Sequence, residues 1–98
     1  KTELKVAKIL SAEKIEDSDK LYKIQIDLGL ETRQIVSGLV KYYTAEELVG
    51  KKVVVVTNLE PAKLRGVESN GLLLAAGDGD FVKLLTVDGD IECGTNIH

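Results

Sequence analysis

Hydrophobic and polar positions alternate along much of this 98-residue chain, which is typical of β-strands that bury one face. The clearest run is Leu21–Leu28, where Ile24, Ile26 and Leu28 alternate with polar side chains and Gly29 ends the run. We therefore predict an amphipathic strand over this segment.

The first strand is predicted to be long and bent. Leu4, Val6 and Lys8 keep one alternation, and Ile9 and Leu10 then break its phase. A slip of one residue within a strand indicates a β-bulge, which bends a strand around a small barrel.

Further strands follow on the C-terminal side. The expected order is a strand at Arg33–Ser37, a strand at Lys51–Thr57, a loop at Asn58–Gly66, a strand at Leu72–Ala76, a tight turn at Gly77–Asp80, a strand at Phe81–Val87 and a hairpin turn at Asp88-Gly89. Four consecutive valines in the second of these strands indicate burial on both faces.

One helix is predicted, between the third and fourth strands. Thr44 and Glu47 have the spacing of a capping box, and Gly50 supplies a stop one or two turns later. Three strands, a short helix and further strands predict an all-β fold. We interpret it as a five-stranded oligonucleotide/oligosaccharide-binding barrel (OB-fold) with one short helix and extra C-terminal strands. An unrelated small β-barrel or a split sandwich is the alternative.

Composition is that of one globular domain spanning residues 1–98, with 44% hydrophobic and 30% charged residues. No apolar run approaches the roughly 18 residues needed to cross a bilayer. The N-terminal residues also lack the apolar core of a secretion signal, so we expect a cytoplasmic protein with no membrane contact. The chain contains no Met, and we expect it to be a piece of a longer chain; the family resemblance described below implies a C-terminal fragment.

The formal net charge of −3 hides a gradient along the chain. Residues 1–32 carry a net −1, residues 33–65 a net +3 and residues 66–98 a net −5. The middle third could present one basic surface to an anionic partner, although scatter along the chain would give the same totals.

Catalytic machinery is not predicted. The single His is the last residue, His98. Cys93 is the single Cys, so it has no second Cys and no internal His to pair with. Ser37 lacks the Gly two places before it that a nucleophile elbow needs. The Gly77–Asp80 turn lacks the further oxygen ligands of a calcium loop. We therefore expect no enzyme activity, no cofactor and no metal in this fragment.

Binding is the remaining class of function. The aromatic residues are Tyr22, Tyr42, Tyr43 and Phe81, and we place Phe81 in the core. This is few for a groove that stacks bases. Cations and small polar residues suit phosphate and 2′-hydroxyl contacts on a folded RNA better.

The segment Asn58–Gly71 has the pattern N-L-x-P-x-K-x-R-G-x-x-S-x-G. With Asp19-Lys20-Leu21, Ile26–Gly29 and Arg33–Leu39, it resembles the tRNA-binding OB-fold domain family over nearly the whole chain. Lys41–Gly50 and Ala75–Asp80 look most like the version at the C-terminus of bacterial methionyl-tRNA synthetases.

The resemblance implies a non-catalytic module that grips tRNA by shape, with little dependence on sequence. It also implies a module that raises the effective tRNA concentration at the synthetase's catalytic domains and forms a homodimer. The implied RNA-binding residues are Lys63, Arg65, Asn58, Ser69, Arg33, Lys20 and Lys41. Lys63 and Arg65 rank first, because by position they would face phosphates from the loop that Pro61 braces.

Several alternatives stay open from sequence. Asn58 could instead tie the loop backbone, Ser69 could be a turn or strand-end residue, and Lys20 could pair with Asp17 or Asp19. At the level of function, the alternatives are a stand-alone dimeric tRNA-binding protein, a related export chaperone that binds peptides, and a structural dimerisation domain. The segment Ile91–Gly94 departs from the proline-glycine pair common in the family and bears on dimerisation.

Overall fold

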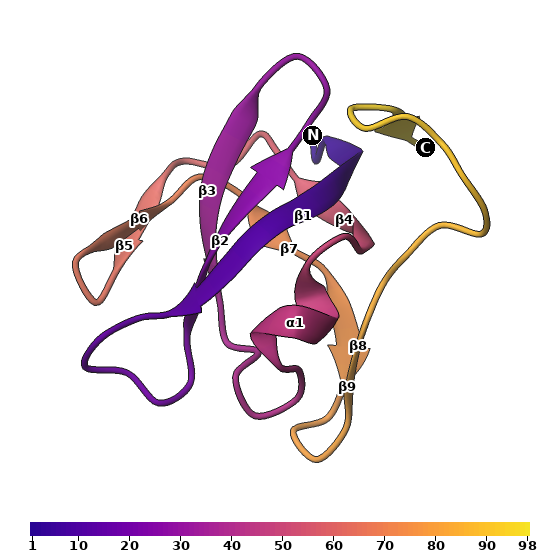
Figure 1. The fold of residues 1–98 in the computed structure, drawn as a ribbon. Coiled ribbons are helices and arrows are strands. Elements are labelled where there is room, and N and C mark those ends of the chain that lie inside the picture. The colour runs from indigo at the N-terminus through magenta and orange to yellow at the C-terminus, as the bar shows by residue number, and fades with distance from the viewer.

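The longest strand, β1 (Leu4–Lys14), is the centre of the sheet in this computed structural model, which describes residues 1–98 (Figure 1). Its neighbours are β2 (Tyr22–Asp27) and β4 (Lys52–Val56), and β3 (Thr32–Ser37) and β7 (Leu72–Leu73) form the two ends. The strand order is β3-β2-β1-β4-β7, with β10 (Asn96–Ile97) also paired to β1. These pairs are all antiparallel.

A bulge lies in the middle of β1, where its partners change. The N-terminal part of β1 pairs with β4 and β10, and the pairing with β2 begins at Lys8, just before the bulge, and continues to the end of the strand. The register shifts between Ile9 and Ser11, which leaves Leu10 as the extra residue. This confirms the predicted bulge at the phase break, and the bend lets one strand serve both sides of a curled sheet.

The sheet is closed at its β3 edge by the segment that leads into β7. The amide of Asn70 donates to the carbonyl of Gln34 (2.8 Å), and the Val36 amide donates to the Ser69 hydroxyl (2.9 Å). Edge groups that would otherwise lack partners are therefore satisfied. The all-β, OB-fold-like barrel predicted from the strand order is confirmed.

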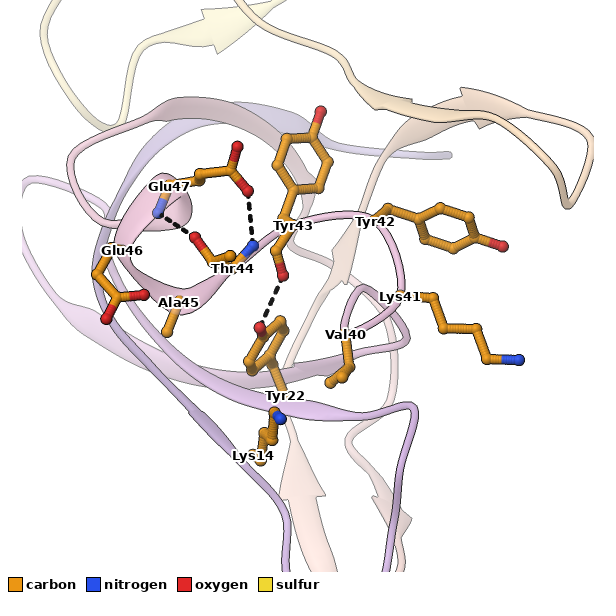
Figure 2. A pocket seen from close by; sticks show the side chains of 10 residues that line it. All are labelled: Lys14, Tyr22, Val40, Lys41, Tyr42, Tyr43, Thr44, Ala45, Glu46 and Glu47. Carbon is orange, nitrogen blue, oxygen red and sulfur yellow. Dashed lines mark hydrogen bonds between the residues drawn. The ribbon is translucent and has the colours of Figure 1, made fainter.

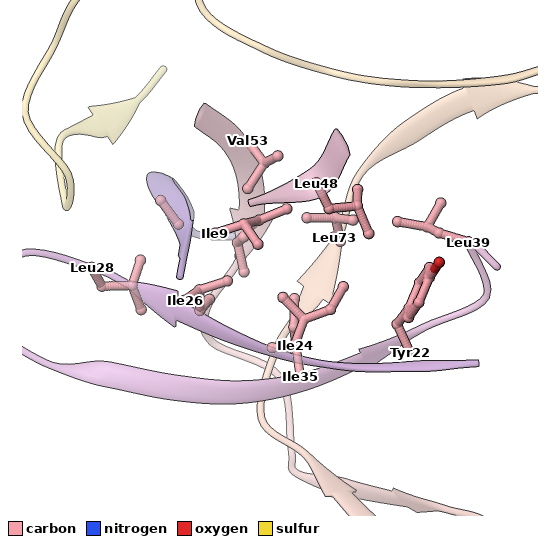
Figure 3. Close-up of a cluster of buried hydrophobic side chains, with 12 residues drawn as sticks. Ile9, Tyr22, Ile24, Ile26, Leu28, Ile35, Leu39, Leu48, Val53 and Leu73 are labelled. Carbon is pink, nitrogen blue, oxygen red and sulfur yellow. The ribbon is translucent and has the colours of Figure 1, made fainter. Parts of the chain in front are cut away.

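The core fills the inside of this curled sheet (Figure 3). Its largest fully buried side chains include Ile9, Ile24, Ile26 and Ile35. The four valines of β4 are buried on both faces, as predicted, at 7% exposure or less. Close packing of branched side chains stabilises the barrel without a disulfide.

Helix α1 (Ala45–Leu48) packs against the barrel through Leu48, which is fully buried. Both hydrogen bonds of the predicted capping box are present. The Glu47 amide donates to the Thr44 hydroxyl (3.1 Å), and the Thr44 amide donates to the Glu47 carboxylate (2.7 Å).

Three local predictions were wrong. The segment predicted as a loop contains the start of a hairpin, formed by β5 (Ala62–Leu64) and β6 (Val67–Ser69). The strand predicted at Leu72–Ala76 is divided between β7 and β8 (Ala75–Gly77), and the latter forms a separate two-stranded ribbon with β9 (Val82–Leu84). Asp88-Gly89 is a bend rather than a hairpin turn, because the chain after β9 crosses the molecule before β10 pairs with β1.

Phe81 was also placed wrongly. It lies at the tip of the β8–β9 ribbon and is 74% exposed, because the ribbon projects beyond the barrel. Its side chain therefore contributes little to the core.

Candidate nucleic-acid interface

The β5–β6 hairpin projects from the side of the barrel and carries the two highest-ranked cations (Figure 1). Its register pairs Leu64 with Val67, which leaves Arg65 and Gly66 as a two-residue turn. Both turn residues have positive φ, +53° and +78°, as in a type I′ turn. The turn places Arg65 at the hairpin tip, where its side chain is exposed.

Lys63 lies one residue before the end of β5 and is directly opposite Glu68 on β6. Both side chains are exposed, and they share the face of the hairpin opposite to that of Ser69. The Glu68 carboxylate opposite Lys63 reduces the positive electrostatic potential around the Lys63 ammonium, although the two side chains form no ion pair.

A cleft of about 360 Å³ lies between the hairpin and the loop that joins β1 to β2. Arg65 lines it from the hairpin, and Lys14 and Lys23 line it from the sheet. Three acidic residues share the lining: Glu13, Glu16 and Asp17. Glu13 is already paired with Lys23 at 2.8 Å, so part of this negative charge is neutralised within the protein.

Arg33 has a structural position as well as a charge. Its guanidinium donates to the carbonyl of Thr57 (2.7 Å) and forms an ion pair with Glu31 (3.2 Å). The side chain is only 17% exposed, so little of its donor capacity remains for a phosphate.

Asn58 and Ser69 do not present free side chains for RNA in this structure. The Asn58 amide oxygen accepts from the Glu3 amide (2.8 Å), and its Nδ2 donates to the Lys1 carbonyl. The Ser69 hydroxyl is buried, accepts from Val36 and donates to the Gly71 carbonyl (3.2 Å). Ser69 is thus a strand-end residue, and Asn58 is tied to the N-terminal segment rather than to the backbone of its own loop.

Lys20 and Lys41 lie on two loops that are hydrogen-bonded to each other, and neither residue lines the cleft beside the hairpin. The Lys20 carbonyl accepts from the amide of Val40, which joins the β1–β2 loop to the β3–α1 loop. Both lysine side chains are exposed, and the pairing of Lys20 with Asp17 or Asp19 is not formed. The seven predicted residues thus occupy several regions and do not form one cluster.

Sequence reasoning missed two polar residues that face this side of the sheet. Gln25 and Gln34 are opposite each other on β2 and β3, and their side-chain amides hydrogen-bond at 3.1 Å. Gln34 also donates to the carbonyl of Glu68 (2.9 Å), which ties the hairpin to the sheet. Their period-2 positions on the polar faces of two neighbouring strands were the available signal.

Sequence reasoning also missed the grouping of the tyrosines. Tyr22, Tyr42 and Tyr43 line a pocket of about 440 Å³ beside the β3–α1 loop (Figure 2). They are close in space because β2 runs beneath that loop, a relation that follows from the pairing of strands rather than from spacing in the chain.

No group of three or more His, Cys, Asp or Glu side chains is arranged to hold a metal ion. The helix has four residues, so it is far too short to cross a bilayer.

A family model described as a putative tRNA-binding domain matches residues 4–96. This chain belongs to that tRNA-binding domain family. Among curated relatives, it is similar to the methionine–tRNA ligase of Thermotoga maritima, with 57% identity over 97 residues. The match covers 99% of this tRNA-binding domain and 15% of the ligase, so the domain spans about one-seventh of that relative.

Several solved structures are similar to this chain. A MetRS-related protein from Pyrococcus horikoshii has a TM-score of 0.92 and 40% identity, over 99% of this tRNA-binding domain and 90% of that chain. The chaperone CsaA from Bacillus anthracis has a TM-score of 0.89 and 27% identity, over the same shares. The family resemblance predicted from the sequence is confirmed.

Proposed function

We propose that this domain binds tRNA by shape as a non-catalytic module of a methionyl-tRNA synthetase. The family match and the identity to a methionine–tRNA ligase support the partner and the parent protein. The observation that carries the proposal is the cleft between the β5–β6 hairpin and the β1–β2 loop, with Arg65 at its rim. In OB-folds, the corresponding loops and the face of strands 2 and 3 bind nucleic acid.

Phosphate contacts supply the affinity in this proposal. Lys14 and Arg65 extend into solvent at the cleft, and Lys63 lies on the adjacent hairpin strand. Contacts to phosphates position a folded RNA but do not read its bases, so different tRNA species bind alike. The carboxylates of Glu16 and Asp17 in the same cleft oppose this attraction, which predicts modest affinity.

Modest affinity suits a tethered module. Linked to catalytic domains in the cytoplasm, the domain raises the effective tRNA concentration at those domains, without taking part in the chemistry. Dimerisation would add a second RNA-binding face and strengthen binding further.

The test is the salt dependence of tRNA binding by the isolated domain and by two variants. For wild type, affinity is expected to fall about ten- to hundredfold between 50 and 200 mM salt, as for a few phosphate contacts. Lys63→Gln and Arg65→Gln should each weaken binding of several tRNA species by a similar factor and reduce the salt slope by about one.

The matched control is Lys8→Gln, which makes the same charge change at an exposed position of β1 that lines none of the clefts. Affinity that does not change with salt, or an equal loss for all three variants, would contradict the proposal.

Peptide binding is the second candidate function, and it is supported by the structural similarity to CsaA. Several large hydrophobic side chains are exposed, among them Leu30, Leu64 and Phe81. Unfolded clients would contact such side chains. Suppression of client aggregation by the domain, with no tRNA shift in a gel, would favour this function over tRNA binding.

A further inference from the structure

The tyrosine pocket is lined by the β3–α1 loop, by helix α1 and by one residue each of β1 and β2, and each tyrosine hydroxyl is hydrogen-bonded to a different part of the backbone. The Tyr42 hydroxyl donates to the carbonyl of Gly79 in the β8–β9 turn (2.6 Å), and the Tyr22 hydroxyl donates to the carbonyl of Tyr43 (2.7 Å). The Tyr43 hydroxyl accepts from the amide of Leu84 (3.1 Å). Rings held in this way are preorganised for a ligand, because little rotamer freedom is lost on binding.

The rings differ in what they offer. Tyr22 is almost fully buried and belongs to the core. Tyr43 is partly buried, and the Lys51 ammonium lies 5.8 Å from its ring centroid. Tyr42 is partly exposed and projects from the β3–α1 loop beside Lys41 (Figure 2). The exposed part of Tyr42 is therefore the surface on which a flat ligand would stack.

Two lysines give the pocket an anion-attracting side. Lys14 and Lys41 are both exposed, line the pocket and form no ion pair. Of the two carboxylates in the lining, Glu47 is engaged in the capping box, and Glu46 is exposed at the helix side. One pocket thus combines an aromatic ring, the ammonium of Lys41 next to it in the chain, and a second unpaired ammonium from Lys14, a set that matches a base joined to its phosphates.

The pocket adjoins the cleft that carries the proposed function, because Lys14 lines both the tyrosine pocket and the cleft beside the β5–β6 hairpin. The Lys14 ammonium is therefore within reach of an RNA chain that occupies either one. The pocket volume of about 440 Å³ is also within the usual range for small-ligand sites.

We propose that this pocket holds an unpaired nucleotide of the bound RNA, with its base stacked on Tyr42 and its phosphates beside Lys14 and Lys41. The inference rests on the proposed function and deepens it. The hairpin and cleft contact the folded body of the RNA, and the tyrosine pocket takes a single-stranded part. A short single-stranded RNA is therefore a ligand in its own right, whereas a blunt duplex reaches only the cleft.

The first test uses the unmodified protein. Aromatic proton NMR is simple here, because the chain has three Tyr, one Phe and no Trp. Addition of a six-nucleotide single-stranded RNA should shift the Tyr42 ring protons upfield, while a twelve-base-pair blunt duplex should leave them unchanged. No shift of Tyr42 at saturating hexamer would overturn the inference.

The second test compares variants by fluorescence anisotropy with the labelled hexamer. Tyr42→Leu should weaken hexamer binding about 5- to 150-fold, as for the loss of one base stack. Tyr42→Phe, which keeps the ring and loses only the bond to Gly79, should lose far less. Lys14→Gln should weaken binding more than the control Lys8→Gln.

The outcomes separate this inference from the proposed function. If Arg65→Gln weakens tRNA binding but Tyr42→Leu binds the hexamer like wild type, the pocket inference fails and the proposed function stands. If neither tRNA nor hexamer binds to wild type, both fail. If Tyr42→Leu changes the sedimentation mass while hexamer binding is intact, the pocket is a protein contact and the inference is overturned.

Discussion

At the scale of single residues, the structure separates cations that are free from polar groups that the fold uses. Ser69 and Asn58 fall on motif positions, yet both side chains are hydrogen-bonded within the protein. Ser69 helps to close the barrel, and Asn58 binds the N-terminal segment. A motif records that a residue type is needed at a position, but not whether the fold or a ligand needs it. Arg65 is the opposite case, because it occupies a conformation that its side chain does not favour.

Replacement of Arg65 by Asn should separate stability from binding. Asn tolerates positive φ better than Arg, so the free energy of unfolding should stay equal or rise by up to about 1 kcal/mol. The lost charge should weaken tRNA binding several-fold. Urea unfolding and a binding titration on the same sample check both. Arg65→Lys, which keeps the charge, should bind nearly as wild type; a clear loss of stability in Arg65→Asn would contradict the turn assignment.

Removal of the Ser69 hydroxyl should open the barrel seam. Ser69→Ala leaves the buried Val36 amide without an acceptor, at an expected cost of about 1–3 kcal/mol in unfolding free energy. Ser37→Ala is the control, because the Ser37 side chain makes no hydrogen bond and a change within about 0.5 kcal/mol is expected. Faster hydrogen exchange of the Val36 amide in Ser69→Ala alone would locate the effect; equal stability of the two variants would count against it.

At the scale of elements, local patterns predicted those features that local physics determines. Three such features were predicted correctly, because each depends on neighbours in sequence: the bulge in β1, the capping box of α1 and the burial of β4 on both faces. The β5–β6 hairpin was not predicted, since strands of three residues carry too little alternation. For the β8–β9 ribbon, the turn and a strand containing β9 were predicted, but the separation of β8 from β7 was not. The pairing of such short strands is decided by the turn and by tertiary contacts.

The C-terminal segment docks on the barrel through two glycines that approach each other's backbone. A Cβ on Gly29 would lie 2.5 Å from the Cys93 carbonyl oxygen, and one on Gly94 would meet the carbonyl oxygen of Leu28. The Gly94 amide also donates to the Val6 carbonyl (2.7 Å). Only residues without a side chain allow this approach.

Gly94→Ala should therefore detach this segment. Gly89 provides a matched control, because its φ of +95° is close to the +90° of Gly94 and nothing lies within 4 Å of an added Cβ. Gly89→Ala is expected to cost about 1 kcal/mol from backbone strain, and Gly94→Ala about 1–3 kcal/mol more from the clash. Thermal unfolding of both variants measures the difference. Equal melting temperatures would show that the glycine contact is dispensable.

At the scale of the whole molecule, the charge pattern predicted only part of the interface. The basic middle third supplies the hairpin cations, but the β1–β2 loop brings acidic residues of the first third into the same cleft. The barrel topology decides which segments meet. A sum of charges along the chain therefore cannot predict which charges share one surface. The tyrosine pocket was hidden for the same reason: its three rings come from β2 and from the loop after β3.

The pairing of β10 with β1 places Ile97 opposite Leu4, so the N-terminal and C-terminal segments of the chain lie side by side. Because the two termini are close together, the chain is almost a closed ring. The packing of the core therefore does not determine at which point of this ring the chain must begin and end. A circular permutant that joins residue 98 to residue 1 by a short glycine-serine linker and opens at the exposed Asp88-Gly89 bend should fold with the same core. Its NMR spectrum should reproduce the wild-type signals of β1 to β4; a spectrum without dispersed signals would show that the order of the strands in the chain is itself required.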